Sequence, residues 1–374
     1  MKVFRNILAT PICLPSKSIS LNNFSDYLKG HEKLIIAIAG VVFTTVAVAS
    51  KVQAVTLATP FSSLYSLTDL GAISKLPIAY GGLTFKAEDP STLLIGGSSD
   101  FPDAGFYSVS VTRDTENHIT SFGNASLFAK SPGINGGGID AGLTYSPDRD
   151  VLLYTTYPDN SIGQIKTGSS SPDKQTDLGT IGISDSTGSL GFVPEGLTGA
   201  GQLKISSYST NKFYSTNVNR DSGTYGIAVP SKSVSLSGGL DGFVYVKAGN
   251  PGFSDDSLLM SEYDNNAIAA YKIDANGDPI PDSRRDFITG IGYHSPTSLI
   301  GVQGATVDPV TGDFLFSTYF EGDPSVSKVY EVRRSEQLTS VPEPQGVGAF
   351  VTALALIGFR VVSNTKKSGN TSGL

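Results

Sequence analysis

The amino-acid sequence predicts an all-β repeat fold between two apolar terminal segments. Three observations support this prediction. The central region alternates short apolar runs with turn residues and holds no sustained apolar period of 3.6 residues. One six-residue pattern recurs five times, and a second landmark, a Gly followed by a short apolar run, precedes each copy. Regular recurrence at this period is typical of repeat architectures.

The six-residue pattern begins with an apolar residue and ends in four of five copies with Tyr. Its copies are 93–98, 152–157, 203–208, 258–263 and 314–319, so their starts lie 59, 51, 55 and 56 residues apart. A short apolar run bounded by turn residues is typical of a buried strand. We therefore predict that each copy forms the second strand of one structural unit.

The Gly landmark predicts the first, inner strand of each unit. Its copies are 82–85, 142–145, 196–198, 242–245 and 304–307. Polar turns such as 146–150 and 308–313 join it to the six-residue pattern and suit a tight hairpin. Gly is expected at this position because inner strands crowd one another where a side chain would collide.

A third strand follows each six-residue pattern, and a weaker fourth completes the unit. The third strands are expected at 105–109, 162–165, 212–215, 269–273 and 328–332. Four antiparallel strands in about 55 residues, repeated around an axis, resemble a β-propeller. We expect five blades, with six as the alternative if a degenerate unit lies in a linker. A β-sandwich or a β-solenoid is the competing architecture.

A ring of blades must also close, and residues near the N-terminal end of the body supply a candidate. Residues 68–73 resemble 176–181, which occupy an outer-strand position in the second blade. The fifth unit ends after its third strand at Val332. We therefore predict that the N-terminal segment adds the missing outer strand to the last blade.

The C-terminal segment 339–374 carries a short motif, an apolar run at 346–359 and a basic end at 360–367. Pro-Glu-Pro cannot continue a helix, so it separates the body from the apolar run. This order resembles the PEP-CTERM sorting tail of exported bacterial proteins. The residues that carry the resemblance are Val341, Pro342, Glu343, Pro344, Arg360, Lys366 and Lys367.

The resemblance implies a substrate of an exosortase-type sorting enzyme. In that family the tail holds the protein in the inner membrane until the enzyme cuts near the motif and releases or attaches the body. The fourteen apolar residues are short of the about 20 that a membrane span needs, but Arg360 can snorkel to the interface. The alternatives are a helix packed on the body or a permanent anchor.

The N-terminal segment 1–54 also predicts export. An apolar run at 34–49 follows Lys29 and Lys33 and precedes small residues, which is typical of a signal peptide with cleavage by signal peptidase after Ala49 or Ala54. Its polar leader is unusually long, so an uncleaved anchor is the alternative. The expected location is transient inner-membrane anchoring, then the cell surface or extracellular space.

Composition narrows the classes of partner. The single Cys is Cys13, in the predicted signal segment, so the body 55–338 holds no disulfide and depends on its own core. The whole chain carries a net charge of −7. Residues 1–54 carry +4 and residues 341–374 carry +2, so residues 55–340 carry −13. Such an acidic surface repels phosphate backbones, which excludes nucleic acid as the expected ligand.

One constellation could hold a metal ion. Acidic and amide residues stand before the inner-strand glycines, and a propeller would gather them at one mouth of the channel. The Pro194–Glu195–Gly196 sequence is similar to the strand entry of lactonase and gluconolactonase-like propellers, a resemblance that implies Ca²⁺, which takes oxygen ligands. Ordinary turn and solubility roles are the favoured interpretation. The residues are Asp140, Glu195, Asp241 and Gln303.

Other polar landmarks predict structure more than chemistry. No nucleophile elbow, zinc-binding helix motif or phosphate loop occurs, so no catalytic residue is assigned. His118 and His294 are expected in surface loops, and 274–278 in a hairpin turn. The tyrosines that close the six-residue pattern are expected to pack between blades and not to form a sugar-binding face. They are Tyr157, Tyr208, Tyr263 and Tyr319.

The combined features predict an exported cell-surface or extracellular-matrix protein with a binding or structural role. The exosortase resemblance implies association with exopolysaccharide or with surface proteins. The alternative is a calcium-dependent, lactonase-like hydrolase with Glu195 and Asp241 as metal ligands.

Overall fold

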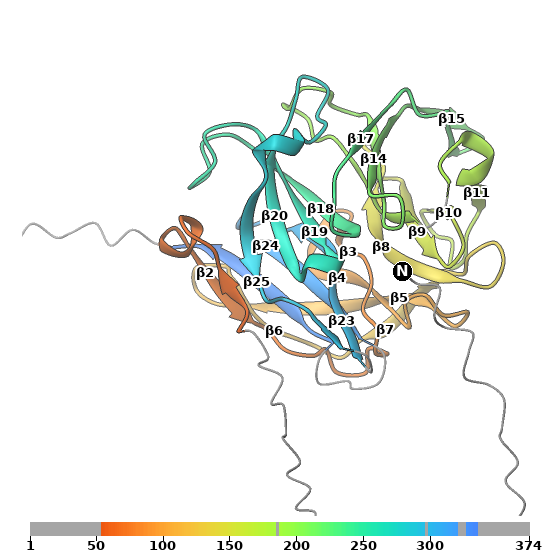
Figure 1. Cartoon of the computed structure of the whole chain (residues 1–374). Helices are drawn as coiled ribbons and strands as arrows, with labels where there is room; N and C mark the ends of the chain where they lie inside the picture. Colours follow the sequence, from red (N-terminus) through yellow and green to blue (C-terminus); the bar gives the residue numbers. More distant parts are fainter. Residues whose placement is uncertain (1–53, 185–186, 296–297, 321–326, 336–374) are drawn as a thin grey trace, which may run out of the picture. The chain divides into compact units, whose positions relative to one another are not determined.

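The body is built from β-sheets arranged as blades around one axis (Figure 1). The computed structural model describes residues 54–184, 187–295, 298–320 and 327–335. The predicted sorting tail, with its motif and basic residues, lies outside the described residues, as does the predicted signal segment up to residue 53, including Ala49. Within the described residues, no helix is long and apolar enough to cross a bilayer.

The first two blades follow the predicted strand order. Each has antiparallel neighbours in sequence order, from the inner to the outer strand. The first blade comprises β3 (Leu83–Lys86), β4 (Asp89–Gly97), β5 (Gly105–Arg113) and β6 (Ile119–Phe122), with β7 (Ser126–Lys130) also paired to β5. The second comprises β8 (Gly138–Tyr145), β9 (Val151–Tyr157), β10 (Ser161–Lys166) and β11 (Lys174–Asp177).

The other three blades keep the same order with local additions. The third comprises β12 (Thr187–Phe192), β13 (Leu203–Ser207), β14 (Lys212–Thr216) and β17 (Lys232–Ser235), with the hairpin β15 (Val218–Asp221) and β16 (Thr224–Ile227) inserted. The fourth comprises β18 (Leu240–Val246), β19 (Ser257–Glu262), β20 (Ala267–Lys272) and β21 (Arg285–Thr289). The fifth comprises β22 (Tyr293–Ser295), β23 (Ser298–Val307), β24 (Phe314–Phe320) and β25 (Val329–Arg334).

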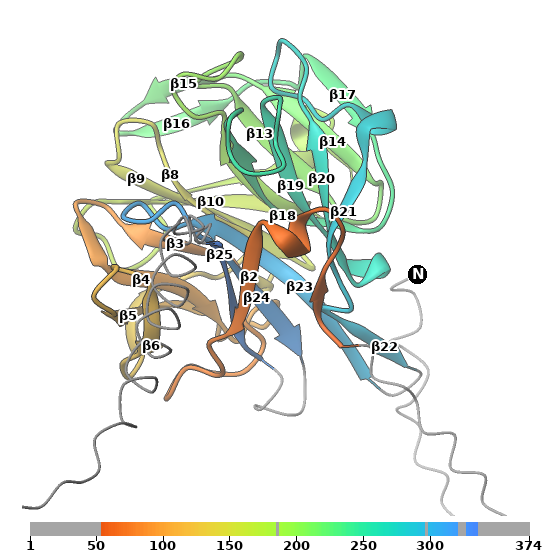
Figure 2. The same ribbon diagram turned by 90° about the vertical axis from the view of Figure 1, so that its left-hand side faces the viewer.

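The N-terminal segment closes the ring, as the sequence predicted. Strand β2 (Tyr65–Asp69) pairs with β25 as the outer strand of the fifth blade. The pairing continues beyond β2, because the Leu70 N–H donates to the Val329 carbonyl and the Val329 N–H donates to the Gly71 carbonyl. Strand β1 (Thr56–Leu57) extends the fourth blade by pairing with β21. Figure 2 shows the orange strand β2 beside the blue strands β24 and β25 of the fifth blade.

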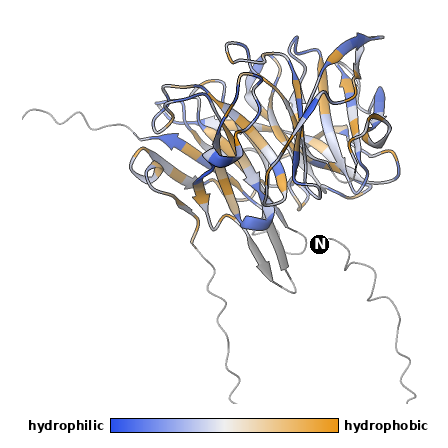
Figure 3. Ribbon diagram, turned by 45° about the horizontal axis from the view of Figure 1, so that its top comes forward, coloured by the Kyte–Doolittle hydropathy of each residue, from blue (hydrophilic) through white to orange (hydrophobic). Residues whose placement is uncertain are grey.

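Each junction between neighbouring blades has its own apolar core. Separate cores lie between blades one and two, two and three, three and four, and four and five. One more core lies between blades five and one. Figure 3 shows apolar residues concentrated on the strands and polar residues on the outer loops. Five junctions for five blades mean that the ring is closed, which confirms the predicted five-bladed β-propeller.

The inner strands meet so closely at the axis that glycine is required there. A Cβ at Gly82 would lie 2.8 Å from the Ala141 carbonyl oxygen of the next blade, and one at Gly242 would lie 2.2 Å from the Gln303 carbonyl oxygen. Real Cβ atoms do not approach a neighbouring backbone so closely. The crowding predicted for the inner-strand glycines is therefore confirmed at both positions.

A buried hydroxyl at the fourth position of the six-residue pattern links neighbouring inner strands. The Ser206 hydroxyl accepts from the Ser189 N–H of its own blade (2.7 Å) and donates to the Asp241 carbonyl of the next (2.9 Å). Thr155 and Ser317 make the same pair of bonds in the second and fifth blades. In the fourth blade, Ser261 is buried, and its hydroxyl has no hydrogen-bond partner among the described residues.

The helical elements of the described residues are short 3₁₀ turns. They are η3 (Phe61–Ser63), η4 (Leu178–Ile181), η5 (Tyr263–Asn265) and η6 (Pro281–Ser283). The first of them carries Phe61, whose ring lies 5.1 Å from that of Phe253 and 4.9 Å from that of Phe287, measured between centroids. This aromatic cluster fastens the N-terminal segment to the fourth blade.

One strand prediction is wrong. The inner strand of the third blade is Thr187–Phe192, whereas the sequence predicted it at 196–198. Residues 196–198 lie in the turn between β12 and β13. The actual strand contains Gly188 and Gly191 and has a bulge in its pairing with β13, so its residues gave a weaker strand pattern than the Gly-Leu-Thr sequence that follows.

Candidate functional site: the axial pocket and the closing seam

A pocket of about 590 Å³ opens where the inner strands end. Its walls come from the ends of β3, β8, β12 and β23 and from the turns that follow them. We call this hollow the axial pocket. Its volume lies in the range of small-molecule sites, about 300–1,000 Å³. The lining residues that the argument uses are Thr84, Thr144, Thr306, Tyr145, Phe192 and Glu195.

Hydroxyls and aromatic rings dominate these walls. Thr84, Thr144 and Thr306 occupy the same position of three inner strands, two residues after the inner-strand Gly. Tyr145 and Phe192 are half-buried, so part of each ring faces solvent. Burial raises the pKa of the Tyr145 phenol, which keeps it protonated and able to donate. The pocket therefore offers neutral donors, acceptors and flat apolar faces.

The charged residues that line the axial pocket lie at its edge. Arg149 and Glu195 are exposed lining residues, and the Arg149 guanidinium lies 3.3 Å from the Glu88 carboxylate. Glu195 is the single carboxylate among the residues that line the pocket. General acid–base hydrolysis of a glycosidic bond needs a pair of carboxylates. This lining is better suited to binding than to that chemistry.

Buried tyrosines pack together near the beginnings of the inner strands. Tyr208, Tyr263 and Tyr319 form one cluster with Ala79, and the Tyr208 and Tyr263 rings meet edge to face at 5.8 Å between centroids. The Tyr208 hydroxyl donates to Asp264. The prediction that these residues pack in the body is confirmed for these three, while Tyr157 is half-buried.

Of the four proposed metal ligands, Asp140 and Asp241 lie near the beginnings of β8 and β18, and Gln303 lies in the middle of β23. Two of these three are in contact. The Gln303 amide donates to the Asp140 carboxylate (3.2 Å), and both side chains are buried. The first blade has Gly81 before its inner-strand Gly82, and a Cβ at Gly81 would lie 2.6 Å from the Asp140 carbonyl oxygen. Asp241 is also buried, at the start of β18.

Glu195 does not belong to that group. It lies in the turn after β12, whereas Asp140 and Asp241 lie at the starts of β8 and β18. The error follows from the misplaced inner strand of the third blade. The equivalent residue of that blade is Gly188, which has no side chain to offer as a ligand. The predicted four-ligand calcium site therefore lacks Glu195, and of the carboxylates proposed from the third and fourth blades only Asp241 remains.

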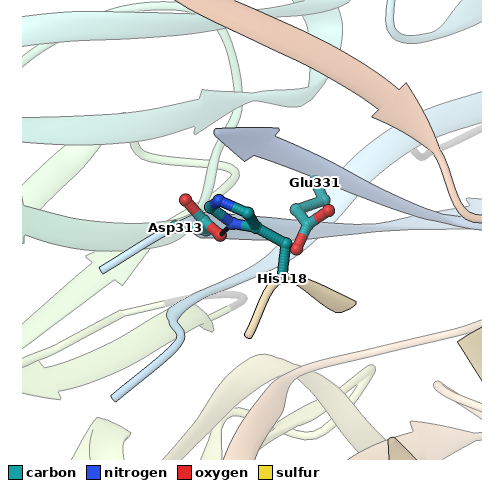
Figure 4. A group of neighbouring side chains, drawn as sticks. All are labelled: His118, Asp313 and Glu331. Carbon is teal, nitrogen blue, oxygen red and sulfur yellow. Dashed lines mark hydrogen bonds and ion pairs between the residues drawn. The ribbon is translucent and has the colours of Figure 1, made fainter. Parts of the chain in front are cut away.

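A second polar cluster lies at the junction of the first and fifth blades, which we call the closing seam. It comprises Arg113, His118, Asp308, Asp313, Glu331 and Arg333. The His118 Nδ1 lies 2.5 Å from an Asp313 carboxylate oxygen, and ligand atoms of His118, Asp313 and Glu331 lie within 4.8 Å of one another. Figure 4 shows the imidazole between the two carboxylates, with its contact to Asp313 dashed.

Neighbouring groups hold the seam carboxylates in place. Arg113 donates two bonds to Asp308, whose side chain is fully buried. Glu331 accepts from the Ile119 N–H and from Arg333, and Asp313 accepts from the Thr311 hydroxyl. Burial by itself lowers the pKa of His118, but the hydrogen bond and charge of Asp313 outweigh it and raise the pKa above its usual value.

The sequence predicted the turn that contains His118 but missed the partner of this residue. Asp313 and Glu331 lie about two hundred residues further along the chain, so no local spacing could link them to His118. The available signal was the closure of the ring, which brings the first and fifth blades together. For His294, whose backbone lies in β22, the predicted loop is wrong.

The turn at 274–278 connects β20 and β21, as predicted, and also holds a buried ion pair. The Asp274 N–H donates to the Asp278 carbonyl, which closes the turn. Asp278 accepts from the ammonium of Lys204 in the third blade (2.6 Å), and both side chains are almost completely buried. This pair explains why a Lys occupies the second position of one six-residue pattern.

No family model matches this chain, and no curated protein matches it. Similar solved structures include a glucose dehydrogenase (10% identity, 72% of this chain, 100% of that chain, TM-score 0.39). They also include a Trichoderma reesei protein of carbohydrate-active enzyme family AA12 (10%, 75%, 98%, 0.40) and the β-propeller domain of Cps50 (Swd1) from Myceliophteria thermophila (10%, 67%, 69%, 0.34). Likenesses this weak carry no conclusion about activity.

Proposed function

We propose that this chain is an exported, non-catalytic β-propeller that binds glycan at the cell surface or in the extracellular matrix. The observation that carries the proposal is the axial pocket, whose walls combine threonine hydroxyls with aromatic rings. Sugars present hydroxyls at their edges and apolar C–H groups on their faces. Walls of this kind can therefore bond the edge of a sugar ring while an aromatic ring covers its face.

The charge of the body supports this ligand class. Residues 55–340 carry a net charge of −13, so polyanions such as nucleic acids or phosphate-rich polymers are repelled at long range. Neutral sugars approach such a surface without this penalty. The Arg149 guanidinium at the pocket edge gives one point of attraction for a carboxylated sugar.

The two terminal segments supply the location in this proposal. The apolar run after residue 33 is expected to direct export, and the tail after residue 340, by its resemblance to PEP-CTERM tails, is expected to be cut by an exosortase-type enzyme. Intact-mass spectrometry of the protein from its native host tests both. A C-terminus near Pro342 to Pro344 is expected, and a mature species that keeps Leu374 would contradict processing.

The calcium-dependent hydrolase is the less favoured function. Glu195 and Asp241 were its proposed ligands, and they belong to opposite ends of their inner strands. Thermal unfolding of the full chain with Ca²⁺ and with EDTA separates the two functions. We expect Ca²⁺ to leave the unfolding temperature unchanged. A rise in that temperature with Ca²⁺ that disappears in Asp241→Asn, together with lactone hydrolysis, would favour the enzyme.

Glycan binding is tested by an array of oligosaccharides that includes neutral and uronate-containing members. The full chain, purified in mild detergent, is compared with Tyr145→Ala, which removes one aromatic wall of the axial pocket. We expect retention of at least one saccharide class by the unaltered chain and its loss in the variant. Binding to none of the saccharides would overturn the proposal.

A further inference from the structure

The closing seam brings together nitrogen and oxygen donors that suit a transition metal. His118 lies in the β5–β6 turn, Asp313 lies directly before β24, and Glu331 lies in β25. One ligand atom from each lies within 4.8 Å of the others (Figure 4). We propose that the closing seam binds one divalent metal ion of the zinc type through His118, Asp313 and Glu331.

The donor set decides the class of metal. One imidazole nitrogen and two carboxylate oxygens match zinc sites, whose bonds are about 2.0–2.2 Å long. Calcium prefers six to eight oxygen ligands and would leave the imidazole unused. Three protein ligands leave a fourth position, and the His118 side chain, 19% exposed, marks the side from which water can reach it.

The ligands need only a small movement to accept the ion. The His118 Nδ1 and the Asp313 oxygen lie 2.5 Å apart. Two ligand atoms of a tetrahedral zinc ion lie about 3.3 Å apart, so the pair must open by about 1 Å. His118 stands in a turn that can provide this movement, while Asp313 and Glu331 precede and occupy strands of the fifth blade.

The partners of the carboxylates match those of ligating residues. The Thr311 hydroxyl bonds Asp313 (2.6 Å), and the Ile119 N–H bonds Glu331 (3.1 Å). Each carboxylate oxygen has two lone pairs, so these bonds leave capacity for a metal and fix the orientation of the ligand. Arg333, which donates to Glu331, acts as such an orienting partner.

The charge balance of the closing seam also favours a dication. Asp308 is matched by Arg113 through two bonds, and the Arg333 guanidinium is shared by Glu331 and Asp114. Asp313 is 3% exposed and has only the imidazole as a charged partner among these seam groups. Buried carboxylates are stable when a cation compensates them. A metal ion would compensate two of them and tie the first blade to the fifth.

The experiment uses the full chain, stripped of metal by a chelator and kept at about pH 8, well above the usual imidazole pKa of about 6.5, to limit competition from protons. Metal content after dialysis against Zn²⁺ is measured, together with thermal unfolding in Zn²⁺, Ca²⁺ and EDTA. We expect one zinc per chain and a rise in the unfolding temperature with Zn²⁺ alone. At a zinc concentration a hundred times the dissociation constant, the folding equilibrium constant should rise about a hundredfold.

Variants identify the site. His118→Gln and Asp313→Asn should lose both the bound zinc and the thermal shift. The control Lys272→Gln removes an exposed ion pair with Asp255 that lies outside the seam, and it should keep both. Less than one zinc in the unaltered chain would overturn the proposal, as would zinc retained in His118→Gln. If a ligand variant does not fold, absorption of the Co²⁺-loaded chain decides, since the tetrahedral, histidine-containing site predicts intense visible bands and hexa-aquo Co²⁺ gives weak ones.

Discussion

The buried hydroxyl that joins neighbouring inner strands gives the sharpest stability prediction. In Ser206→Ala, the Ser189 N–H and the Asp241 carbonyl lose their shared partner at a position closed to water. An orphaned buried polar group costs about 1–3 kcal/mol. Because the strands can relax partially, we expect the two groups together to lower the free energy of unfolding by about 2–4 kcal/mol.

The fourth blade supplies a matched control at the same position of the repeat. The Ser261 hydroxyl is buried without a hydrogen-bond partner among the described residues, so Ser261→Ala removes an unsatisfied group and leaves none behind. Its effect should be below about 0.5 kcal/mol or stabilising. Urea unfolding of the full chain, followed by tyrosine fluorescence because the sequence has no Trp, measures both. Equal losses in the two variants would refute the reasoning.

Three further predictions concern packing, charge and pH. Phe61→Ala should cost about 3–5 kcal/mol, because the ring is fully buried against Phe253 and Phe287; a loss below 1 kcal/mol in thermal unfolding would contradict its fastening role. Asp278→Asn should cost about 3–5 kcal/mol by leaving the Lys204 ammonium buried and uncompensated, and Lys204→Met combined with it should recover part of the loss. Burial raises the pKa of Asp274, but the Lys232 hydrogen bond and backbone N–H groups outweigh it and lower the pKa to about 2. The contribution of Asp274 to the free energy of unfolding is therefore complete above about pH 4 and is lost toward pH 2. In an acid titration, Lys232→Gln should lose less stability over that window.

The strand pattern was predictable because each blade repeats the same local chemistry. The apolar start of the six-residue pattern marks a buried strand in every blade, and the match between residues 68–73 and 176–181 indicated which segment closes the ring. The third inner strand was missed because Gly188 and Gly191 weaken its strand pattern, while the neighbouring turn carries a stronger one.

The polar sites were predictable only in part, because they depend on contacts between blades. The sequence identified Asp140 and Gln303 as residues of one axial group, since each stands within two residues before an inner-strand Gly, and the two side chains are in contact. The axial pocket itself required the ends of four inner strands to be placed together. The closing seam joins His118 to residues near the end of the body, and only the closed ring creates that contact.

Titration of the full chain with the saccharide that it retains from the array tests the axial pocket as the binding site most directly. Tyr145→Ala should raise the dissociation constant at least about tenfold, equivalent to about 1.4 kcal/mol of lost ring contact. The control Val229→Ala, at a residue 69% exposed and outside the pocket lining, should leave the constant unchanged. An unchanged constant in Tyr145→Ala, or an equal loss in both variants, would contradict binding at the axis.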